Sequence, residues 1–212
     1  MKSTVTVVMC LFLGAIFLSA QPAWGDDLAP PYWRGWARTT LQEWDFNAAP
    51  NPPDSISPDG QLNNPYGAPR GVLTNGHWYA GSLYADDPGG LKITFNIPNT
   101  PDGGIRKVMR IQLTYQEGSH EPTITIGAWD GPVILPDDAI RPLGNGRVRD
   151  RLTRWYDYQI EPNPTKESVT IEFPFSMGVK LDQVVIDTIC PEPASLTLLA
   201  LGGLGLVRRR NV

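Results

Sequence analysis

Apolar and polar side chains alternate along several short stretches of the chain. Within residues 91–97 every second residue is apolar, and Lys92, Thr94 and Asn96 separate these apolar positions. A period of two places successive side chains on opposite faces of a β-strand, so that one face meets a core and the other meets solvent. The pattern therefore predicts a half-buried strand at this stretch.

Five further stretches show the same period. Their apolar stripes are Met109, Ile111, Leu113 and Tyr115; Ile124, Ile126 and Ala128; Tyr156, Tyr158 and Ile160; Val169, Ile171, Phe173 and Phe175; and Val184 with Ile186. Weaker candidates are residues 40–46, 71–74, 77–84 and 133–135. Clusters of turn-forming residues separate the strands, at residues 51–54, 57–60, 86–90, 99–104 and 144–146.

These patterns predict an all-β fold. No stretch between residues 26 and 190 keeps the apolar period of a helix, and the chain has 21 Gly and 21 Pro, which favour turns over helices. Eight to ten antiparallel strands in one domain fit a two-sheet sandwich, and we expect a jelly-roll-like arrangement. The long irregular stretch at residues 48–69 is interpreted as a surface loop.

The N-terminus has the three parts of a secretory signal peptide. Lys2 is positively charged, residues 5–18 are almost uniformly apolar, and Ala23 and Gly25 supply the small residues before Asp26. We expect cleavage after Gly25. Residues 1–25 are then the signal peptide, and residues 26–190 form the β-sandwich domain.

The C-terminus combines a short apolar segment with a basic end. Residues 196–207 carry no charge, and Arg208, Arg209 and Arg210 follow them directly. As a helix these twelve residues would extend about 18 Å, whereas a hydrocarbon core is about 30 Å thick. We expect a short hydrophobic helix that enters the inner membrane transiently, with the arginines on the cytoplasmic side.

Pro191, Glu192 and Pro193 precede this segment, and the order of motif, apolar segment and arginines resembles the PEP-CTERM sorting signal. The resemblance covers residues 191–212. It implies recognition and cleavage by an exosortase, a membrane protease, in a bacterium with an outer membrane. The product would go to the cell surface or the extracellular matrix. Residues 31–36 and 39–46 also loosely resemble the start of secreted PEP-CTERM proteins of uncharacterised function.

Cysteine content and charge exclude several classes of protein. Cys10 would leave with the signal peptide, so Cys190 is the single remaining thiol and no internal disulfide can form. Residues 26–190 hold 14 Lys or Arg against 21 Asp or Glu, which disfavours a nucleic-acid binder because phosphate contacts need a basic face. The basic stretch formed by Arg141, Arg147, Arg149, Arg151 and Arg154 is interpreted as a solvated face or a contact for acidic polysaccharide.

No catalytic motif is recognisable, and we expect no enzyme activity. Glu43 and Asp45 lie two positions apart on a predicted strand, so their carboxyl groups would share a face, as a glycoside hydrolase requires. Trp44 and Phe46 are the natural core pair on the opposite face. We therefore expect Glu43 and Asp45 to be ordinary polar residues that face solvent.

Aromatic residues suggest a binding surface, because an exposed flat ring can stack on a sugar. Trp78 stands beside Tyr79, and Trp155 stands beside Tyr156, so in each pair one ring must face away from the core. These four residues are the predicted carbohydrate platform.

No cofactor is expected, and neither histidine belongs to a recognisable zinc motif. The alternative is a Ca²⁺ ion held by Asp86 and Asp87 or by Asp137 and Asp138, although neither pair has the spacing of an EF-hand loop. The sequence therefore favours a secreted, exosortase-processed surface or matrix protein without catalysis, which binds extracellular polysaccharide. The alternatives are a secreted glycan hydrolase and a purely architectural surface protein.

Overall fold

The computed structural model describes residues 28–50, 55–85, 89–99, 106–116, 121–129, 135–136, 138–148, 152–174 and 178–191. These residues form twelve β-strands and no α-helix, which confirms the all-β prediction. Within these ranges no helix is long and apolar enough to cross a membrane. The predicted signal peptide and the apolar C-terminal segment lie outside the described residues.

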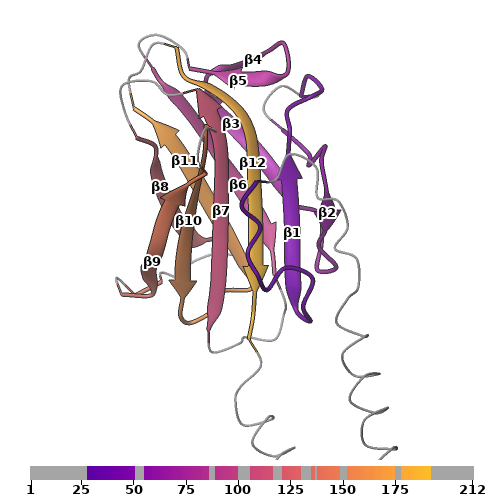
Figure 1. Ribbon diagram of the computed structural model, residues 1–212, viewed down its shortest axis with the longest axis vertical. Coiled ribbons are helices and arrows are strands. Elements are labelled where there is room, and N and C mark those ends of the chain that lie inside the picture. The colour runs from indigo at the N-terminus through magenta and orange to yellow at the C-terminus, as the bar shows by residue number, and fades with distance from the viewer. Residues whose placement is uncertain are drawn as a thin grey trace, which may run out of the picture.

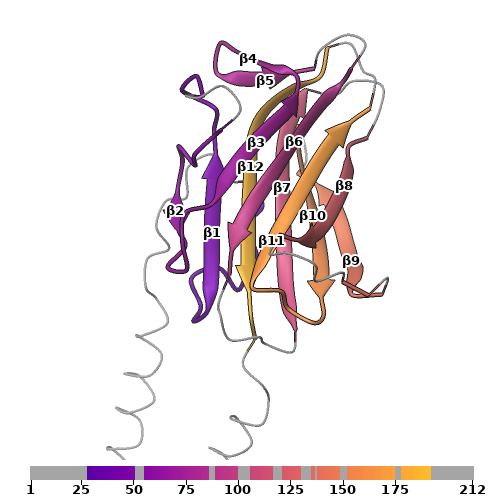
Figure 2. The same ribbon diagram turned by 180° about the vertical axis from the view of Figure 1, so that it is seen from behind.

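The strands form two antiparallel sheets that pack face to face as a sandwich (Figure 1). They are β1 (Thr39–Trp44), β2 (Leu62–Asn63), β3 (Arg70–Asn75), β4 (His77–Tyr79), β5 (Ser82–Tyr84), β6 (Leu91–Pro98), β7 (Lys107–Gln116), β8 (Thr123–Ala128), β9 (Ile140–Arg147), β10 (Thr153–Ile160), β11 (Lys166–Phe173) and β12 (Lys180–Ile189). Sheet A has the order β2-β1-β12-β7-β10-β9, and the β4–β5 hairpin pairs with β12 through β5. Sheet B has the order β3-β6-β11-β8 and faces the viewer in Figure 2.

The core lies between the two sheets and is built from the predicted stripes. The described stripe residues on β6, β7, β11 and β12 are fully or almost fully buried, as are Ile126 and Ile160, while Ile124, Tyr156 and Tyr158 pack against this core. The ring of Phe173 on β11 meets the ring of Tyr115 on β7 edge to face, with centroids 5.0 Å apart. The inward faces of these strands are therefore confirmed.

The stretch predicted as one strand at residues 77–84 is a hairpin of two strands. Ala80 and Gly81 connect β4 to β5 with φ of 47° and 84°. Two successive positive φ angles are the property of the tight turn that matches the twist of paired strands. Trp78 pairs with Leu83 and both pack on the core, so Tyr79 lies on the opposite face of the hairpin.

Residues 144–146 lie within β9, so the prediction of a turn there is wrong. Gly146 pairs with Trp155 of β10. A Cβ atom on Gly146 would lie 2.6 Å from the Trp155 ring, so the glycine leaves room for the indole. The sequence alone does not distinguish a glycine that leaves room for a neighbouring ring from a glycine that permits a turn.

β1 is buried on both faces, which corrects the prediction for Glu43. Trp44 and Phe46 point into the core as expected, but Glu43 on the other face is only 2% exposed. The stretch predicted as a surface loop contains β2, which pairs with β1, and Gly60, whose Cβ would lie 2.5 Å from Glu43 Cγ. This segment covers the carboxylate that the sequence placed in solvent.

The chain before β1 also covers sheet A, because residues 28–38 cross its outer face (Figure 1). Trp33 is 6% exposed, and the Arg34 guanidinium forms a buried ion pair with Asp187 of β12, with Nε to Oδ1 at 2.7 Å. Both faces of the central strands of sheet A are therefore shielded near this segment.

Candidate functional site

The polypeptide leaves the sandwich at the end of β12, directly before the predicted sorting motif. Cys190 is 3% exposed, its amide donates to Arg38 O at 3.3 Å, and its Sγ accepts from Asn163 Nδ2 at 3.4 Å. Burial raises the pKa of the Cys190 thiol. Pro191 is the last described residue, and Glu192, Pro193, Arg208, Arg209 and Arg210 lie outside the described residues. The motif therefore starts without a spacer after the last buried residue.

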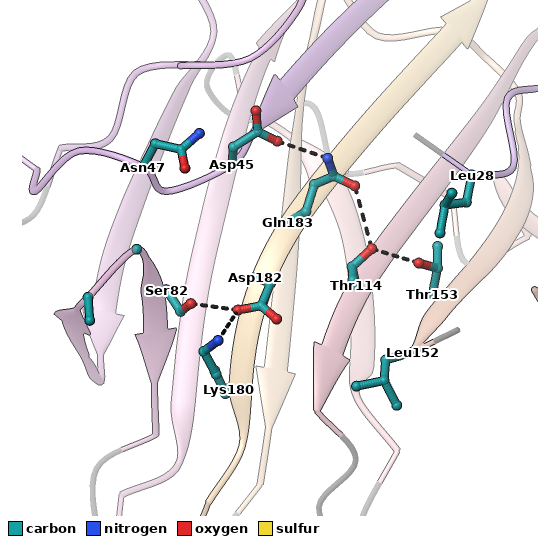
Figure 3. Close-up of a pocket in the computed structure, with 12 residues that line it drawn as sticks. Leu28, Asp45, Asn47, Ser82, Thr114, Leu152, Thr153, Lys180, Asp182 and Gln183 are labelled. Atoms are coloured by element: carbon teal, nitrogen blue, oxygen red, sulfur yellow. Dashed lines mark hydrogen bonds and ion pairs between the residues drawn. The ribbon is translucent and has the colours of Figure 1, made fainter. Parts of the chain in front are cut away.

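A polar pocket of about 690 Å³ opens on the outer face of sheet A (Figure 3). The segment before β1, the residues after β1, the β4–β5 hairpin and the starts of β10 and β12 form its wall. Its lining residues are Leu28, Asp45, Asn47, Ala80, Gly81, Ser82, Thr114, Leu152, Thr153, Lys180, Asp182 and Gln183. Leu28, Leu152 and Ala80 are its apolar side chains, and most of the other lining residues carry hydrogen-bonding side chains.

A line of hydrogen bonds crosses the pocket from β10 to β1. The hydroxyls of Thr153 and Thr114 lie 2.8 Å apart, and Thr114 Oγ1 donates a long hydrogen bond of 3.5 Å to Gln183 Oε1. Gln183 Nε2 donates to Asp45 Oδ1 at 2.8 Å and to Glu43 Oε1 at 2.9 Å. Because both ends of its amide are engaged, Gln183 is held in one orientation.

Lys180 provides the positive charge of the pocket. Its Nζ lies 2.8 Å from Asp182 Oδ1, which also accepts from Ser82 Oγ at 2.5 Å. The hydrogen bond to Asp182 raises the pKa of Lys180, so the amine stays protonated. Lys180 and Asp182 are 32% and 36% exposed at their side chains, which leaves both able to contact a ligand.

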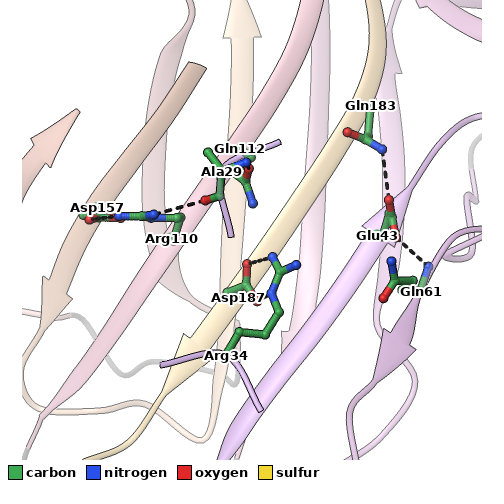
Figure 4. A network of polar contacts seen from close by, with 9 residues as sticks. All are labelled: Ala29, Arg34, Glu43, Gln61, Arg110, Gln112, Asp157, Gln183 and Asp187. Atoms are coloured by element: carbon green, nitrogen blue, oxygen red, sulfur yellow. Dashed lines mark hydrogen bonds and ion pairs between the residues drawn. The ribbon is translucent and has the colours of Figure 1, made fainter. Parts of the chain in front are cut away.

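The segment before β1 is tied to sheet A beside the pocket (Figure 4). Ala29 N donates to Gln112 Oε1 at 2.9 Å, and Arg110 Nη1 donates to Ala29 O at 3.1 Å. Arg110 also pairs with both oxygens of Asp157 at 2.7 Å. These contacts on both backbone atoms of Ala29 fix the position of Leu28 at the pocket wall.

The first predicted aromatic pair is divided between core and surface. Trp78 is half-buried against the core, and its indole N–H donates to Phe46 O at 2.7 Å. Tyr79 is 65% exposed and lies edge to face with Tyr84 at 5.9 Å. Tyr79 pairs with Ser82, which lines the pocket, so its ring lies on the same face of the hairpin as the pocket.

The second pair is divided in the same way, but its outer ring is covered. Tyr156 packs against the core, and Trp155 faces outward over Gly146 with the Arg110 guanidinium 4.5 Å from its ring centroid. Burial is the main cause that raises the pKa of Tyr156 above its ordinary value, and the neighbouring Tyr115 raises this pKa further. Among the four predicted platform residues, Tyr79 has the freest ring, and their role in binding sugar stays a prediction.

The two carboxylates that the hydrolase alternative requires do share a face. Glu43 and Asp45 both accept from Gln183 Nε2, and Glu43 Oε2 accepts from Gln61 N at 2.8 Å. Only Asp45 lines the pocket. Glu43 is buried and both of its oxygens are hydrogen-bonded, as in a structural carboxylate.

Metal ligands do not gather in the described part of the chain, where no group of three or more His, Cys, Asp or Glu side chains converges. Of the carboxylates in the Ca²⁺ alternative, Asp138 is exposed, and Asp86, Asp87 and Asp137 lie outside the described residues.

Sequence reasoning did not find the pocket. Its central residues Thr114, Lys180, Asp182 and Gln183 occupy polar positions on strands whose opposite faces form the core, and such positions usually meet only solvent. The irregular register of β12 between Leu181 and Gln183 was not visible in the pattern. The available clue was that Lys180, Asp182 and Gln183 are three polar residues among the first four of a mostly apolar strand.

Two comparisons with known proteins bear on function. The family model described as PEP-CTERM protein-sorting motif matches residues 190–211, which confirms the C-terminal resemblance. No curated protein matches the chain. The matched motif implies secretion and surface sorting in bacteria and processing by exosortase, a membrane protein. The chain therefore carries a PEP-CTERM sorting signal, which directly follows a β-sandwich domain.

Proposed function

We propose that the chain is a secreted, non-catalytic protein whose sandwich is released from its tail by exosortase and then acts at the cell surface or in the extracellular matrix. The observation that supports this most is the junction at Cys190, where the matched motif starts as the last strand ends. Cleavage close to Pro193 would separate the tail and leave all twelve strands intact. The producing cell would be a bacterium with an outer membrane.

The tail would act during export. Residues 196–207 would enter the inner membrane for a short time, while Arg208, Arg209 and Arg210 remain on the cytoplasmic side and keep the Pro-Glu-Pro motif outside. Mass spectrometry of the intact protein from the culture fluid or cell surface tests this. We expect a chain from Asp26 to the region of Pro193. A mass that includes residues 196–212 would show that the tail is a retained anchor.

The ligand we propose is an extracellular polysaccharide bound at the outer-face pocket. Lys180, Asp182 and Asn47 offer donors and acceptors for sugar hydroxyls, and Tyr79 lies on the same side of the adjoining hairpin. The connections between β6 and β7, β7 and β8, β10 and β11, and β11 and β12 each pass from one sheet to the other. This wrapped order supports a jelly-roll-like fold, which lectin domains also use.

A glycan array on the mature secreted protein tests the binding proposal. We expect retention of one sugar class, and we expect Lys180→Ala and Tyr79→Ala each to weaken it at least tenfold. Tyr32→Ala is the matched control, because this tyrosine is 82% exposed but belongs to the segment before β1 and not to the β4–β5 hairpin that carries Tyr79. A folded protein that binds no sugar class would favour the architectural alternative.

The hydrolase alternative has a separate test. The shared contact of Glu43 and Asp45 with Gln183 is the observation in its favour, and the coverage of Glu43 by residues 59–63 opposes it. Any sugar polymer retained on the array should remain intact after long incubation. Chain shortening that disappears in Asp45→Asn would instead establish a glycan hydrolase.

A further inference from the structure

One end of the core is closed by a buried ion pair between the two sheets. Lys107 opens β7 in sheet A and continues the inward stripe of Met109, while Glu167 lies on β11 in sheet B and continues the inward stripe of Val169. Lys107 Nζ lies 2.5 Å from Glu167 Oε1, and neither side chain has exposed surface. Removing both charges from water is costly, and replacing such pairs by apolar residues is often neutral or stabilising. The burial of this ion pair therefore needs an explanation other than a contribution to stability.

Asn99, at the end of β6, is the third member of this cluster. It is 5% exposed, its backbone amide donates to Thr165 O at 3.0 Å, and its Nδ2 donates to Pro164 O at 3.2 Å. Glu167 pairs with Ile97 of β6, and Asn99 lies two residues further along the chain, so its side chain is a diagonal neighbour of Glu167 on the inward face. Since Glu167 contacts Lys107 and has Asn99 as its diagonal neighbour, the amine and the amide belong to one buried cluster.

Two oxygens in this cluster lack a hydrogen-bond partner among the described residues, namely Asn99 Oδ1 and Glu167 Oε2. Two acceptors cannot satisfy each other unless one of them carries a proton. A proton on Glu167 would turn its carboxyl group into a donor in a cluster that has two acceptors without a partner. Burial acts in this direction, because it raises the pKa of Glu167, although Lys107 and Asn99 oppose it.

Transfer of a proton from Lys107 to Glu167 would leave a neutral amine. A desolvated neutral lysine is a nucleophile, and an amide whose oxygen accepts a hydrogen bond from a carboxylic acid is a polarised electrophile. After this transfer the cluster would hold a nucleophile, an acid and an electrophile in a buried site, close to Cys190, where the sorting motif begins.

We propose that Lys107 and Asn99 form an isopeptide bond. Lys107 Nζ attacks Asn99 Cγ, a Nζ–Cγ bond forms, the Cγ–Nδ2 bond breaks and ammonia leaves. Glu167 accepts a proton from Nζ and gives one to the departing nitrogen, so it returns to its starting state. No oxidant or other reactant is needed. The bond would join sheet A to sheet B in a secreted domain that has no disulfide.

The test is a tryptic map of the mature secreted protein, combined with its intact mass. We expect a mass about 17 Da below that of the unmodified chain, from the loss of one ammonia. We also expect residues 93–106 and residues 107–110 to be recovered as one branched peptide, although trypsin cuts after Arg106. An unchanged mass with separate peptides overturns the proposal.

Two other outcomes also overturn it. A succinimide at an asparagine loses the same mass but leaves the two peptides separate. A branch between residues 107–110 and residues 155–166 would assign the bond to Asn163, which is 6% exposed in the same region, and not to Asn99.

Variants separate the proton relay from the bond itself. Glu167→Gln keeps the shape of the side chain but cannot relay the proton, so we expect the full mass and separate peptides. Glu172→Gln is the matched control on the same strand, because Glu172 is 45% exposed and pairs with Lys92 on the outer face. It should retain the branched peptide. If Glu167→Gln does not fold, the map of the unmodified sequence still decides.

Discussion

Arg34 and Asp187 form an ion pair that fastens the chain before β1 to the middle of sheet A. The guanidinium contacts both carboxylate oxygens, and the two side chains are 4% and 0% exposed. The pair joins the start of the described chain to the strand that leads into the sorting signal. Because residues 28–38 also carry Leu28 and Ala29, this pair supports one wall of the pocket.

Removing one partner of this pair should be strongly destabilising, because Asp187 stays buried after it loses the Arg34 guanidinium. We expect Arg34→Ala to lower the free energy of unfolding by about 3 to 5 kcal/mol in urea melts. Lys92→Ala is the control. It breaks a pair whose side chains are 42% and 45% exposed, and it should cost less than about 1 kcal/mol. Equal losses in the two variants would contradict this account.

Phe173 should be among the most important core residues of sheet B. Its side chain is completely buried and packs edge to face on Tyr115. We expect Phe173→Ala to cost about 3 to 5 kcal/mol in the free energy of unfolding, from lost burial and the cavity left behind. Thr170→Ala on the outer face removes a hydroxyl contact of 2.9 Å to Thr94 and should cost about 1 kcal/mol. The reverse ranking would mean that β11 faces the other way.

The strands could be predicted from the sequence where the burial of a residue depends only on which face of its strand the side chain occupies. The stripe from Val169 to Phe173 meets the opposite sheet directly, so its period of two fixes its orientation. Glu43 was misplaced because its burial depends on residues 59–63, which no local pattern links to β1. Lys107 and Glu167 lie in phase with their inward stripes, so extending each stripe by two residues would have found the buried pair.

Cys190 should be almost inert in the folded protein. Burial raises the pKa of its thiol above the ordinary value of about 8.5, and only the thiolate reacts with disulfide reagents. We expect less than a tenth of the thiol of the folded protein to react with a disulfide reagent at pH 8, in the time that the protein unfolded in urea needs to react completely. A reductant should not change the melting temperature. Rapid stoichiometric reaction of the native protein would contradict the burial of Cys190.

Alkaline conditions should destabilise the domain through two buried tyrosines. Burial raises the pKa of Tyr156 and of Tyr158 above the ordinary value of about 10. Both groups then ionise more readily in the unfolded chain, so stability is complete below about pH 10 and falls as the pH rises further. We expect the urea midpoint to be lower at about pH 11 than at about pH 9, with the loss occurring above about pH 10, and we expect Tyr158→Phe to reduce the difference. A constant midpoint across this range would contradict the prediction.

Export should depend on the charge of the tail and separately on its motif. Changing Arg208, Arg209 and Arg210 to Ser removes the group that holds the C-terminus on the cytoplasmic side, so the tail should pass through and uncleaved precursor should collect in the periplasm. Glu192→Ala leaves the arginines in place and should give uncleaved protein that stays with the membrane fraction. Fractionation with intact-mass measurement separates the two outcomes.

Both precursors should keep a folded sandwich, since Cys190, next to the motif, is buried in it. Protease resistance of residues 28–190 provides this control. Normal cleavage of either variant would mean that the residues changed in that variant are not needed for processing of the segment after Cys190.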